Sequence, residues 1–331
     1  MISVIIPVFN GGRTLSDCLQ ALQRQTHPPD EIIVVDDGST DDTAAVAARF
    51  GVTVVSQPNA GPAAARNRGA EAARGSILLF TDADCAPAPD WIERMSAPFA
   101  DPTVAGAKGE YRTRQRELIA RFVQQEYQDR YDRMAGRSQI DFVDTYSAAY
   151  RRELLLAAGG FDSTFPTASV EDQELSFRLA ERGHRLVYVP GAIVYHQHDR
   201  DLGQYVRRKY WIGFWKALVT RRYPAKLVRD AHTPQTLKVQ MGLAALGGIF
   251  LMIGGTTQKR QALICGWLSW VLLLLSGFRL YAKILRRDAP VLAVAPGLLF
   301  VRAWALSGGF FLGNLRFAMR SWLKTRGNRN L

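Results

Sequence analysis

Two acidic residues separated by one alanine, Asp82 and Asp84, have the spacing of a cation site. They follow the apolar run 76–80, which predicts a strand. In an extended backbone residues i and i+2 point to the same face, so both carboxylates can converge on one hard ion, Mg²⁺ or Mn²⁺, that bridges to a diphosphate. A turn at the strand end is the alternative, because Asp is common there and bonds its own backbone.

A second acidic pair, Glu171 and Asp172, lies far downstream. An ionised Asp can accept a proton from a hydroxyl that becomes nucleophilic, so Asp172 is a candidate general base. The alternative is structural, since Ser169-Val170-Glu171-Asp172 also matches the S-x-x-[DE] pattern that caps a helix N-terminus. The pattern alone favours capping.

A third acidic pair, Asp36 and Asp37, opens the run Asp-Asp-Gly-Ser-Thr-Asp-Asp after another predicted strand. Its carboxylates could accept hydrogen bonds from a base N–H or from ribose hydroxyls. Turn formation and helix capping explain residues 39–42 well, and Asp36 less well.

Basic and imidazole side chains supply further candidates. Arg66 and Arg68 lie near the start of the helix predicted over 63–73, and one of them could meet phosphate, although a solvated arginine is the commoner case. His196 and His198 follow the last short predicted strand and could complete a metal site or touch a diphosphate, or simply be surface or core histidines.

The elements that would position these residues alternate strand and helix patterns, which is typical of a doubly wound parallel sheet. Polar clusters follow the strands, and ligands of such sheets bind at the carboxyl ends of the strands. We therefore expect one crevice. The predicted strands cover 3–8, 31–36, 52–56, 76–81, 142–150, 186–189 and 192–195, and the predicted helices cover 14–25, 43–50, 63–73, 114–134, 151–158 and 171–182.

Several classes of protein are disfavoured. Neither G-x-G-x-x-G after the first strand nor a Gly-Lys-Ser/Thr phosphate loop occurs, which argues against a dinucleotide dehydrogenase or a P-loop enzyme. The 3 cysteines lie far apart, as expected in a reducing cytoplasm. The N-terminus enters a strand without a signal-peptide pattern, so we expect the N-terminal domain to stay in the cytoplasm.

The net charge of +12 indicates an anionic partner. Basic residues and aromatic residues interleave over 200–230, directly before the first long apolar segment. This pattern is typical of a juxtamembrane helix that contacts anionic membrane lipid. Nucleic-acid binding is disfavoured, because no nucleic-acid module is visible.

Apolar segments cover 239–255, 262–278 and 290–315. The first two are predicted to span a bilayer, with a buried helical hairpin as the alternative. Arg302 lies near the middle of the third and must face protein or water. Basic residues flank the third segment on both sides, which predicts a re-entrant or interfacial segment, with a third crossing left open. Gly309 and Gly313 could allow close helix packing.

As an ordered set these residues resemble family 2 glycosyltransferases of the GT-A fold, over roughly residues 1–215. The resemblance implies a GT-A-type doubly wound, mostly parallel α/β sheet followed by transmembrane or interfacial helices. It also implies inverting transfer of a sugar from a nucleotide-sugar donor. The segments that carry it are Ser3–Asn10, Ile33–Asp41, Asn59–Asn67, Asp82–Asp84, Gly160–Asp162, Glu171–Asp172 and Val194–His196.

The resemblance also implies roles. Asp172 would be the catalytic base, and Asp82, Asp84 and His196 would hold a divalent metal, Mg²⁺ or Mn²⁺. Gln204-x-x-Arg207-Arg208 comes close to a Gln-x-x-Arg-Trp motif of processive synthases, and Arg208 in place of tryptophan favours transfer of single sugars. The residues implied to bind the nucleotide sugar are Pro7, Asn10, Asp36, Asp37, Arg66, Asp82, Glu171, Gln204, Arg207 and Arg208.

The expected organisation is a catalytic domain over 1–230 and a membrane-anchoring region over 231–331. It predicts a cytoplasmic-membrane enzyme whose catalytic domain faces the cytoplasm and whose acceptor is lipid-linked or a saccharide. The alternatives are a sugar nucleotidyltransferase that releases pyrophosphate, and a non-catalytic, membrane-anchored sugar-nucleotide-binding protein. The sequence indicates neither the donor sugar nor the oligomeric state.

Overall fold

The computed structural model of the protein describes residues 1–165, 169–228 and 233–327. These residues group into two compact units. The sheet unit comprises Met1–Gln115 and Tyr131–His198, and the helical unit comprises Arg116–Arg130 and Asp199–Leu331. The domain boundary predicted between residues 230 and 231 lies outside the described residues, as do Arg229 and the chain after residue 327.

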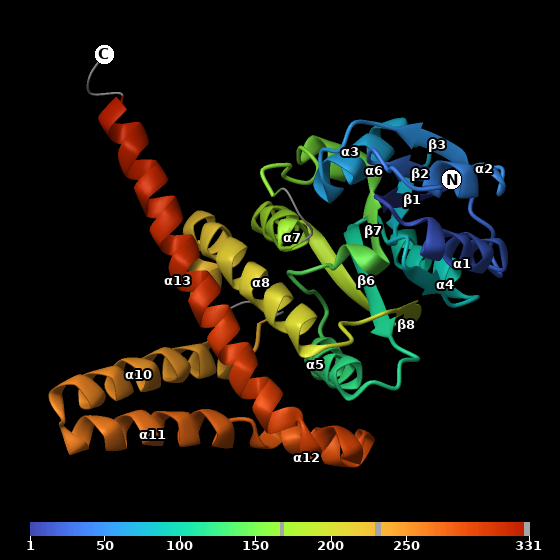
Figure 1. Ribbon diagram of the computed structural model, residues 1–331. Helices are drawn as coiled ribbons and strands as arrows, with labels where there is room; N and C mark the ends of the chain where they lie inside the picture. The colour runs from blue at the N-terminus through green and yellow to red at the C-terminus, as the bar shows by residue number, and fades with distance from the viewer. Residues whose placement is uncertain (166–168, 229–232, 328–331) are drawn as a thin grey trace. The chain divides into compact units, whose positions relative to one another are not determined.

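A mixed sheet forms the centre of the sheet unit (Figure 1). In the described residues its order is β3-β2-β1-β4-β7-β6-β8-β5. The pairs β1–β2, β2–β3, β1–β4 and β6–β8 are parallel, whereas β7 pairs antiparallel with β4 and β6, and β5 antiparallel with β8. The strands are β1 Ile2–Val8, β2 Glu31–Asp36, β3 Thr53–Ser56, β4 Ile77–Phe80, β5 Cys85–Pro87, β6 Val104–Arg112, β7 Ala148–Arg151 and β8 Arg185–His196.

Helices cover both faces of this sheet, because every residue of β1 is buried and a strand is buried throughout only when both faces are covered. The approach of α3 to β1 is close: a Cβ added to Gly69 would lie 2.4 Å from Ile5 Cγ2. The helices of this unit are α1 Gly12–Gln23, α2 Thr43–Ala48, α3 Pro62–Ala72, α4 Trp91–Ser96, α6 Arg152–Ala157 and α7 Glu171–Glu181, with 3-10 turns at Ala97–Ala100 and Thr145–Ser147.

The α/β fold class predicted from the sequence is confirmed, with two corrections in detail. The strand expected over 142–150 begins only at Ala148, because a 3-10 turn precedes it. The two short strands expected at 186–189 and 192–195 form one strand, β8. Gly191, at φ +81°, and a register shift between β8 and β6 near Lys108 allow the chain to pass Pro190 without leaving the sheet.

The helical unit contains the first part of α5 (Leu118–Met134) and the helices that follow the sheet. Antiparallel α10 and α11 form a hairpin, and α13 runs along α8 (Figure 1). Gly309 and Gly313 of α13 face α8, where added Cβ atoms would meet the backbone of Tyr210 and Phe214. The close packing predicted for these glycines is therefore present. The remaining helices are α8 Leu202–Arg222, α9 Pro224–Val228, α10 Gln235–Thr257, α11 Arg260–Leu275, α12 Phe278–Arg287 and α13 Ala295–Gly327, with a 3-10 turn at Ala289–Ala293.

Three stretches of the described chain are long and apolar enough to cross a membrane: Gln235–Thr257, Arg260–Arg287 and Ala295–Met319. The third stretch has 25 residues, so its length permits a full crossing as well as the re-entrant or interfacial arrangement expected from the flanking charges.

Arg302 faces protein, and it is only 8% exposed. Its guanidinium donates to Glu126 Oε1 of α5 at 2.5 Å and to Gln240 Oε1 of α10 at 2.7 Å. Lys209 of α8 donates to the other oxygen of Glu126 at 2.8 Å. Although burial raises the pKa of Glu126, the charges of Lys209 and Arg302 outweigh it and lower the pKa to about 2. One carboxylate thus compensates two buried cations contributed by different helices.

Candidate active site

Arg66 joins the two acidic pairs that the sequence analysis singled out. Its side chain is 3% exposed, with Nη1 donating to Glu171 Oε1 at 2.8 Å and Nη2 to Asp82 Oδ1 at 3.1 Å. Arg66 lies on α3, Asp82 follows β4, and Glu171 begins α7. Their meeting places the Asp82-Ala83-Asp84 segment and the start of α7 next to each other.

Asp172, the predicted base, has an altered acidity. Burial, followed by the neighbouring charge of Glu171, raises its pKa to about 7, and Arg66 offsets part of that rise. A carboxyl group with this pKa exchanges a proton readily near neutral pH.

Of the capping alternative, the Ser169 side-chain cap is not formed in the described residues, whereas Asp172 does lie in the acidic first turn of α7. Val170 occupies the N-cap position of α7 without a side-chain hydrogen bond, and the buried Ser169 Oγ has no hydrogen-bond partner. Glu171 instead accepts from the backbone N–H of Ser169 at 2.7 Å. The carboxylate of Asp172 accepts at 2.7 Å from the adjacent backbone N–H of Gln173.

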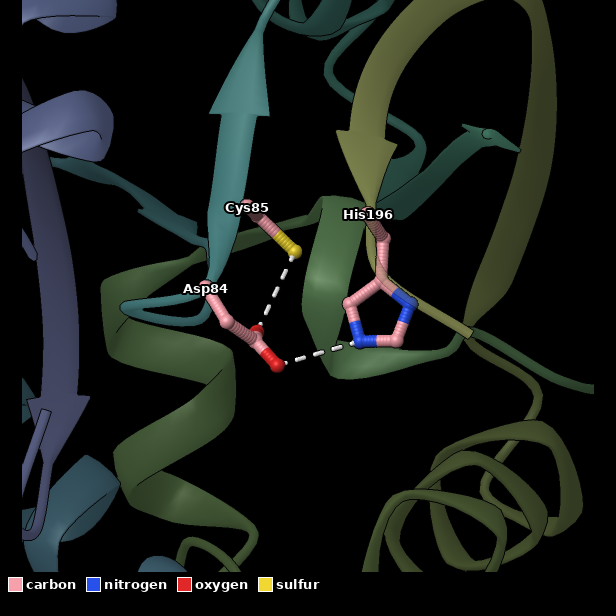
Figure 2. Close-up of side chains that lie close together, drawn as sticks. All are labelled: Asp84, Cys85 and His196. Carbon is pink, nitrogen blue, oxygen red and sulfur yellow. Dashed lines mark hydrogen bonds and ion pairs between the residues drawn. The ribbon is translucent and has the colours of Figure 1, made fainter. Parts of the chain in front are cut away.

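Asp84 and His196 come together at the pairing of β5 with β8 (Figure 2). His196 Nε2 lies 3.2 Å from Asp84 Oδ2, and the Asp84 side chain is 45% exposed. Cys85, which the sequence analysis did not consider as a ligand, contributes its thiol to the same group. Burial raises the pKa of this thiol well above its usual value, as do the charges of Asp84 and Asp82.

The imidazole of His196 is held from two sides. Its Nδ1 lies 3.2 Å from Nδ1 of the buried His198, and its ring stacks on Tyr111 of β6 at 4.5 Å between centroids. Gln115 fixes His198, since its side chain accepts from the N–H of His198 at 2.5 Å and donates to the His198 carbonyl at 3.0 Å. These contacts direct Nε2 of His196 towards Asp84.

The predicted nucleoside-binding residues shape neighbouring loops. Asp37 accepts from Gln57 Nε2 at 2.7 Å and from the backbone N–H groups of residues 60 and 61. Asp36 accepts from the N–H of Ser39 at 2.9 Å. Asn10, at φ +52°, accepts from the N–H of residue 40 at 2.8 Å. Pro7 is buried in β1 opposite β2.

Gln204, Arg207 and Arg208 belong to the helical unit, on α8. There the N–H of Gln204 donates to the side chain of Asp201, the N-cap of α8, at 2.9 Å, and Arg208 Nη1 lies 3.7 Å from Asp199 Oδ1. Their roles towards a nucleotide sugar stay predictions.

Sequence reasoning also missed a buried ion pair between Lys108 of β6 and Asp144. Tyr146 connects to both, with 2.8 Å to Asp144 Oδ2 and 3.3 Å to Lys108 Nζ. The field of Lys108 slightly lowers the pKa of Asp172. The sequence signal that could have revealed this pair is Lys108 itself, because the other residues of 104–109 are small or apolar and predict burial.

A mixed α/β sheet that gathers an Asp-x-Asp segment and a second acidic pair beyond its strands defines a GT-A-like domain. Residues 3–157 match the family model described as glycosyl transferase family 2. This part of the chain, slightly less than half of its 331 residues, is therefore similar to family 2 glycosyltransferases.

Relatives and solved structures show the same similarity. A pre-mycofactocin glycosyltransferase of Mycobacterium tuberculosis is 31% identical over 280 residues, which cover 80% of this chain and 55% of the relative. This chain thus spans about half the length of that relative. Glycosyltransferase AglE of Haloferax volcanii is 28% identical over 64% of this chain and 71% of its own length.

Among solved structures, the mannosyltransferase PcManGT of Pyrobaculum calidifontis matches with a TM-score of 0.56 at 20% identity, over 95% of this chain and 85% of its own. Glucosyl-3-phosphoglycerate synthase of Mycobacterium tuberculosis matches with a TM-score of 0.50 at 23% identity, over 67% of this chain and 79% of its own. At these identities the matches establish the fold.

Proposed function

We propose that this protein transfers a sugar, with inversion, from a nucleotide-sugar donor to a hydroxyl acceptor. The observation that carries the proposal is the double ion pair of Arg66, which brings Asp82 beside Glu171 and therefore beside Asp172. A diphosphate-binding group and a proton acceptor belong next to each other in a direct displacement at an anomeric carbon.

Asp172 is the base in this mechanism. It takes the proton of the acceptor hydroxyl as that oxygen attacks the anomeric carbon from the side opposite the leaving diphosphate, which inverts the configuration. Its pKa of about 7 leaves it ionised in much of the protein at neutral pH and makes it a stronger base than an ordinary carboxylate. Arg66 opposes the rise that burial causes in the pKa of Asp82, and it pairs with Glu171 next to the base.

A divalent metal fits the residues at Asp84. The half-exposed carboxylate and the Nε2 of His196 are donors that Mn²⁺ accepts, and Asp82 retains a second carboxylate oxygen beside the one that Arg66 contacts. When bound, the metal would offset the negative charge of the leaving diphosphate. Support comes from PcManGT and the glucosyl-3-phosphoglycerate synthase, which were solved with Mn²⁺ and a nucleotide sugar.

Asp36 and Asp37 are proposed to contact the nucleoside, together with Pro7 and Asn10. Both carboxylates are buried at the end of β2, where they are already oriented by loop N–H groups. A ligand would meet a preformed surface and would not have to order it.

The region 231–331 is proposed to anchor the enzyme in the cytoplasmic membrane, with 1–230 as the catalytic domain on the cytoplasmic side. Large apolar side chains of α10 and α11, such as Met252 at 64% and Trp267 at 60%, are exposed in the described structure, as lipid-facing residues are. A lipid-linked or membrane-proximal saccharide acceptor follows from this placement.

Release of nucleotide diphosphate from a panel of nucleotide sugars, with purified protein in detergent and added membrane lipids, tests the proposal. Asp172→Asn and Asp84→Ala should lower turnover by about 10²-fold or more. Asp90→Asn is the matched control, because Asp90 lies on the surface in an exposed ion pair with Arg94. We expect turnover close to that of the wild type for this variant.

Three other outcomes would change the proposed mechanism or the proposed function. Full turnover by Asp172→Asn would remove that residue as the base. Pyrophosphate as the product would identify a nucleotidyltransferase. Absence of turnover with every donor and with Mg²⁺ or Mn²⁺ would favour the sugar-nucleotide-binding protein.

A further inference from the structure

Three different donor atoms converge beside the second aspartate of the Asp-x-Asp segment. The ligand atoms of Asp84, Cys85 and His196 all lie within 4.8 Å of one another. Figure 2 shows the thiol and the imidazole directed at the same carboxylate, with 3.8 Å from Cys85 Sγ to Asp84 Oδ1 and 3.2 Å from His196 Nε2 to Asp84 Oδ2. Tetrahedral zinc, with bonds of about 2.0–2.3 Å, holds such atoms about 3.3–3.5 Å apart, so small side-chain rotations suffice.

The chemistry of this donor set differs from that of a magnesium site. Mg²⁺ prefers oxygen ligands and water, whereas sulfur and imidazole together select zinc-type ions. Divalent zinc also binds a given set of ligands more tightly than Mn²⁺ in the usual order of stability. The thiol of Cys85 therefore gives the site a preference that Asp84 and His196 alone would not have.

The backbone and the surrounding side chains hold the three donors in place. Cys85 and His196 are directly opposite each other in the β5–β8 pairing. In the tautomer in which His196 Nδ1 donates to His198, Nε2 keeps its lone pair for an ion, and the stacking on Tyr111 fixes the ring plane. Three protein ligands leave a fourth position for water or a phosphate oxygen.

We propose that Asp84, Cys85 and His196 form a binding site for a zinc-type, thiophilic divalent ion. Binding replaces the thiol proton of Cys85 by a metal–sulfur bond, and the proton passes to solvent. Because Asp84 serves both ions, the thiophilic ion displaces Mn²⁺ and, where the proposed transfer depends on Mn²⁺, inhibits it. The binding itself does not depend on the proposed function.

Cd²⁺, a spectroscopic substitute for Zn²⁺, tests the sulfur ligand directly. Titration of the full chain in detergent should give an ultraviolet thiolate-to-Cd²⁺ charge-transfer band in the wild type and in Cys265→Ser, whose exposed thiol lies on α11. The band should disappear in Cys85→Ala. Competition of Zn²⁺ against the spin-resonance signal of bound Mn²⁺ should show a Zn²⁺ affinity that falls about tenfold or more in Cys85→Ala.

A second variant keeps the test decisive if Cys85→Ala unfolds. His196→Gln retains the thiol and should also lower the Zn²⁺ affinity about tenfold or more. Absence of the band in the folded wild type would overturn the proposal. A band that persists in folded Cys85→Ala would also overturn it. These measurements need no sugar donor, so failure of the zinc-type site and failure of glycosyl transfer are distinguished by separate readouts.

Discussion

Arg66→Gln would leave two carboxylates of the sheet unit without their shared cation. Arg66 is 2% exposed and contacts Asp82 and Glu171, which a shorter neutral amide cannot serve together. Arg68→Gln, two positions along the same helix, is the matched control, because Arg68 pairs with Glu71 at 3.9 Å and both side chains are more than half exposed.

The expected loss follows from burial. Removing one partner of a buried ion pair costs about 3–5 kcal/mol, whereas an exposed pair contributes about 0–1 kcal/mol. A unit of this size shifts its midpoint by about 2–4 °C per kcal/mol, so Arg66→Gln should unfold about 10 °C below the wild type. Arg68→Gln should stay within about 4 °C.

The loss of stability caused by Arg66→Gln should depend on pH. Burial raises the pKa of Asp82 in the folded protein, and the charge of Arg66 opposes that rise. Because Arg66→Gln removes this charge, the folded pKa of Asp82 should lie further above its unfolded value in the variant. A carboxyl whose folded pKa is raised stabilises the protein while it is protonated, and this contribution is lost as pH rises through the folded pKa. The gap between variant and wild type should therefore be larger at about pH 8 than at about pH 5.

Thermal unfolding in detergent, followed by intrinsic fluorescence at both pH values, measures these differences for the wild type and the two variants. Equal midpoints for Arg66→Gln and Arg68→Gln would refute the reasoning. A deficit that grows on acidification would refute the assignment of the effect to unpaired carboxylates.

Three more predictions follow from the structure. Nucleotide diphosphate release should rise with pH through a midpoint near 7, the pKa of Asp172, and a rate that is constant from about pH 5.5 to 9 would contradict its role as the base. Glu126→Gln should lower the unfolding midpoint by an amount equivalent to about 3–5 kcal/mol, because Lys209 and Arg302 lose their shared carboxylate. An unchanged midpoint would contradict the stabilising role of these two ion pairs. Gly69→Ala should destabilise by about 1–3 kcal/mol in thermal unfolding, whereas Gly297→Ala, whose added Cβ meets nothing within 4 Å, should not; equal effects would contradict the close packing of α3.

The regular part of the fold was predictable because its signals are local. The run 31–36 predicted β2 with its observed bounds, and turn residues marked the junctions that follow the first three strands. A single sequence carries no pairing information over long separations, so the bond from Arg66 to Glu171, which spans 105 residues, could not be predicted. The role of Arg66 towards a nucleotide sugar stays a prediction.

Two other features could not be predicted from the sequence, because they depend on contacts between distant segments and not on the local sequence pattern. Pro190-Gly191 has the composition of a turn, yet pairing with β6 continues on both sides of it, and pairing with β5 follows at Val194–His196. Cys85 was not predicted as a metal ligand because a single cysteine forms no recognisable metal-binding motif.

The buried contact between Arg302 and Glu126 also constrains how the chain assembles. Glu126 is made 176 residues before its arginine partner, while Lys209 emerges between the two. Lys209 can pair with Glu126 before α13 is made, and Arg302 is the last member of this network to be synthesised. Truncation before residue 302 would therefore leave a core that lacks one of its charges rather than a shorter anchor.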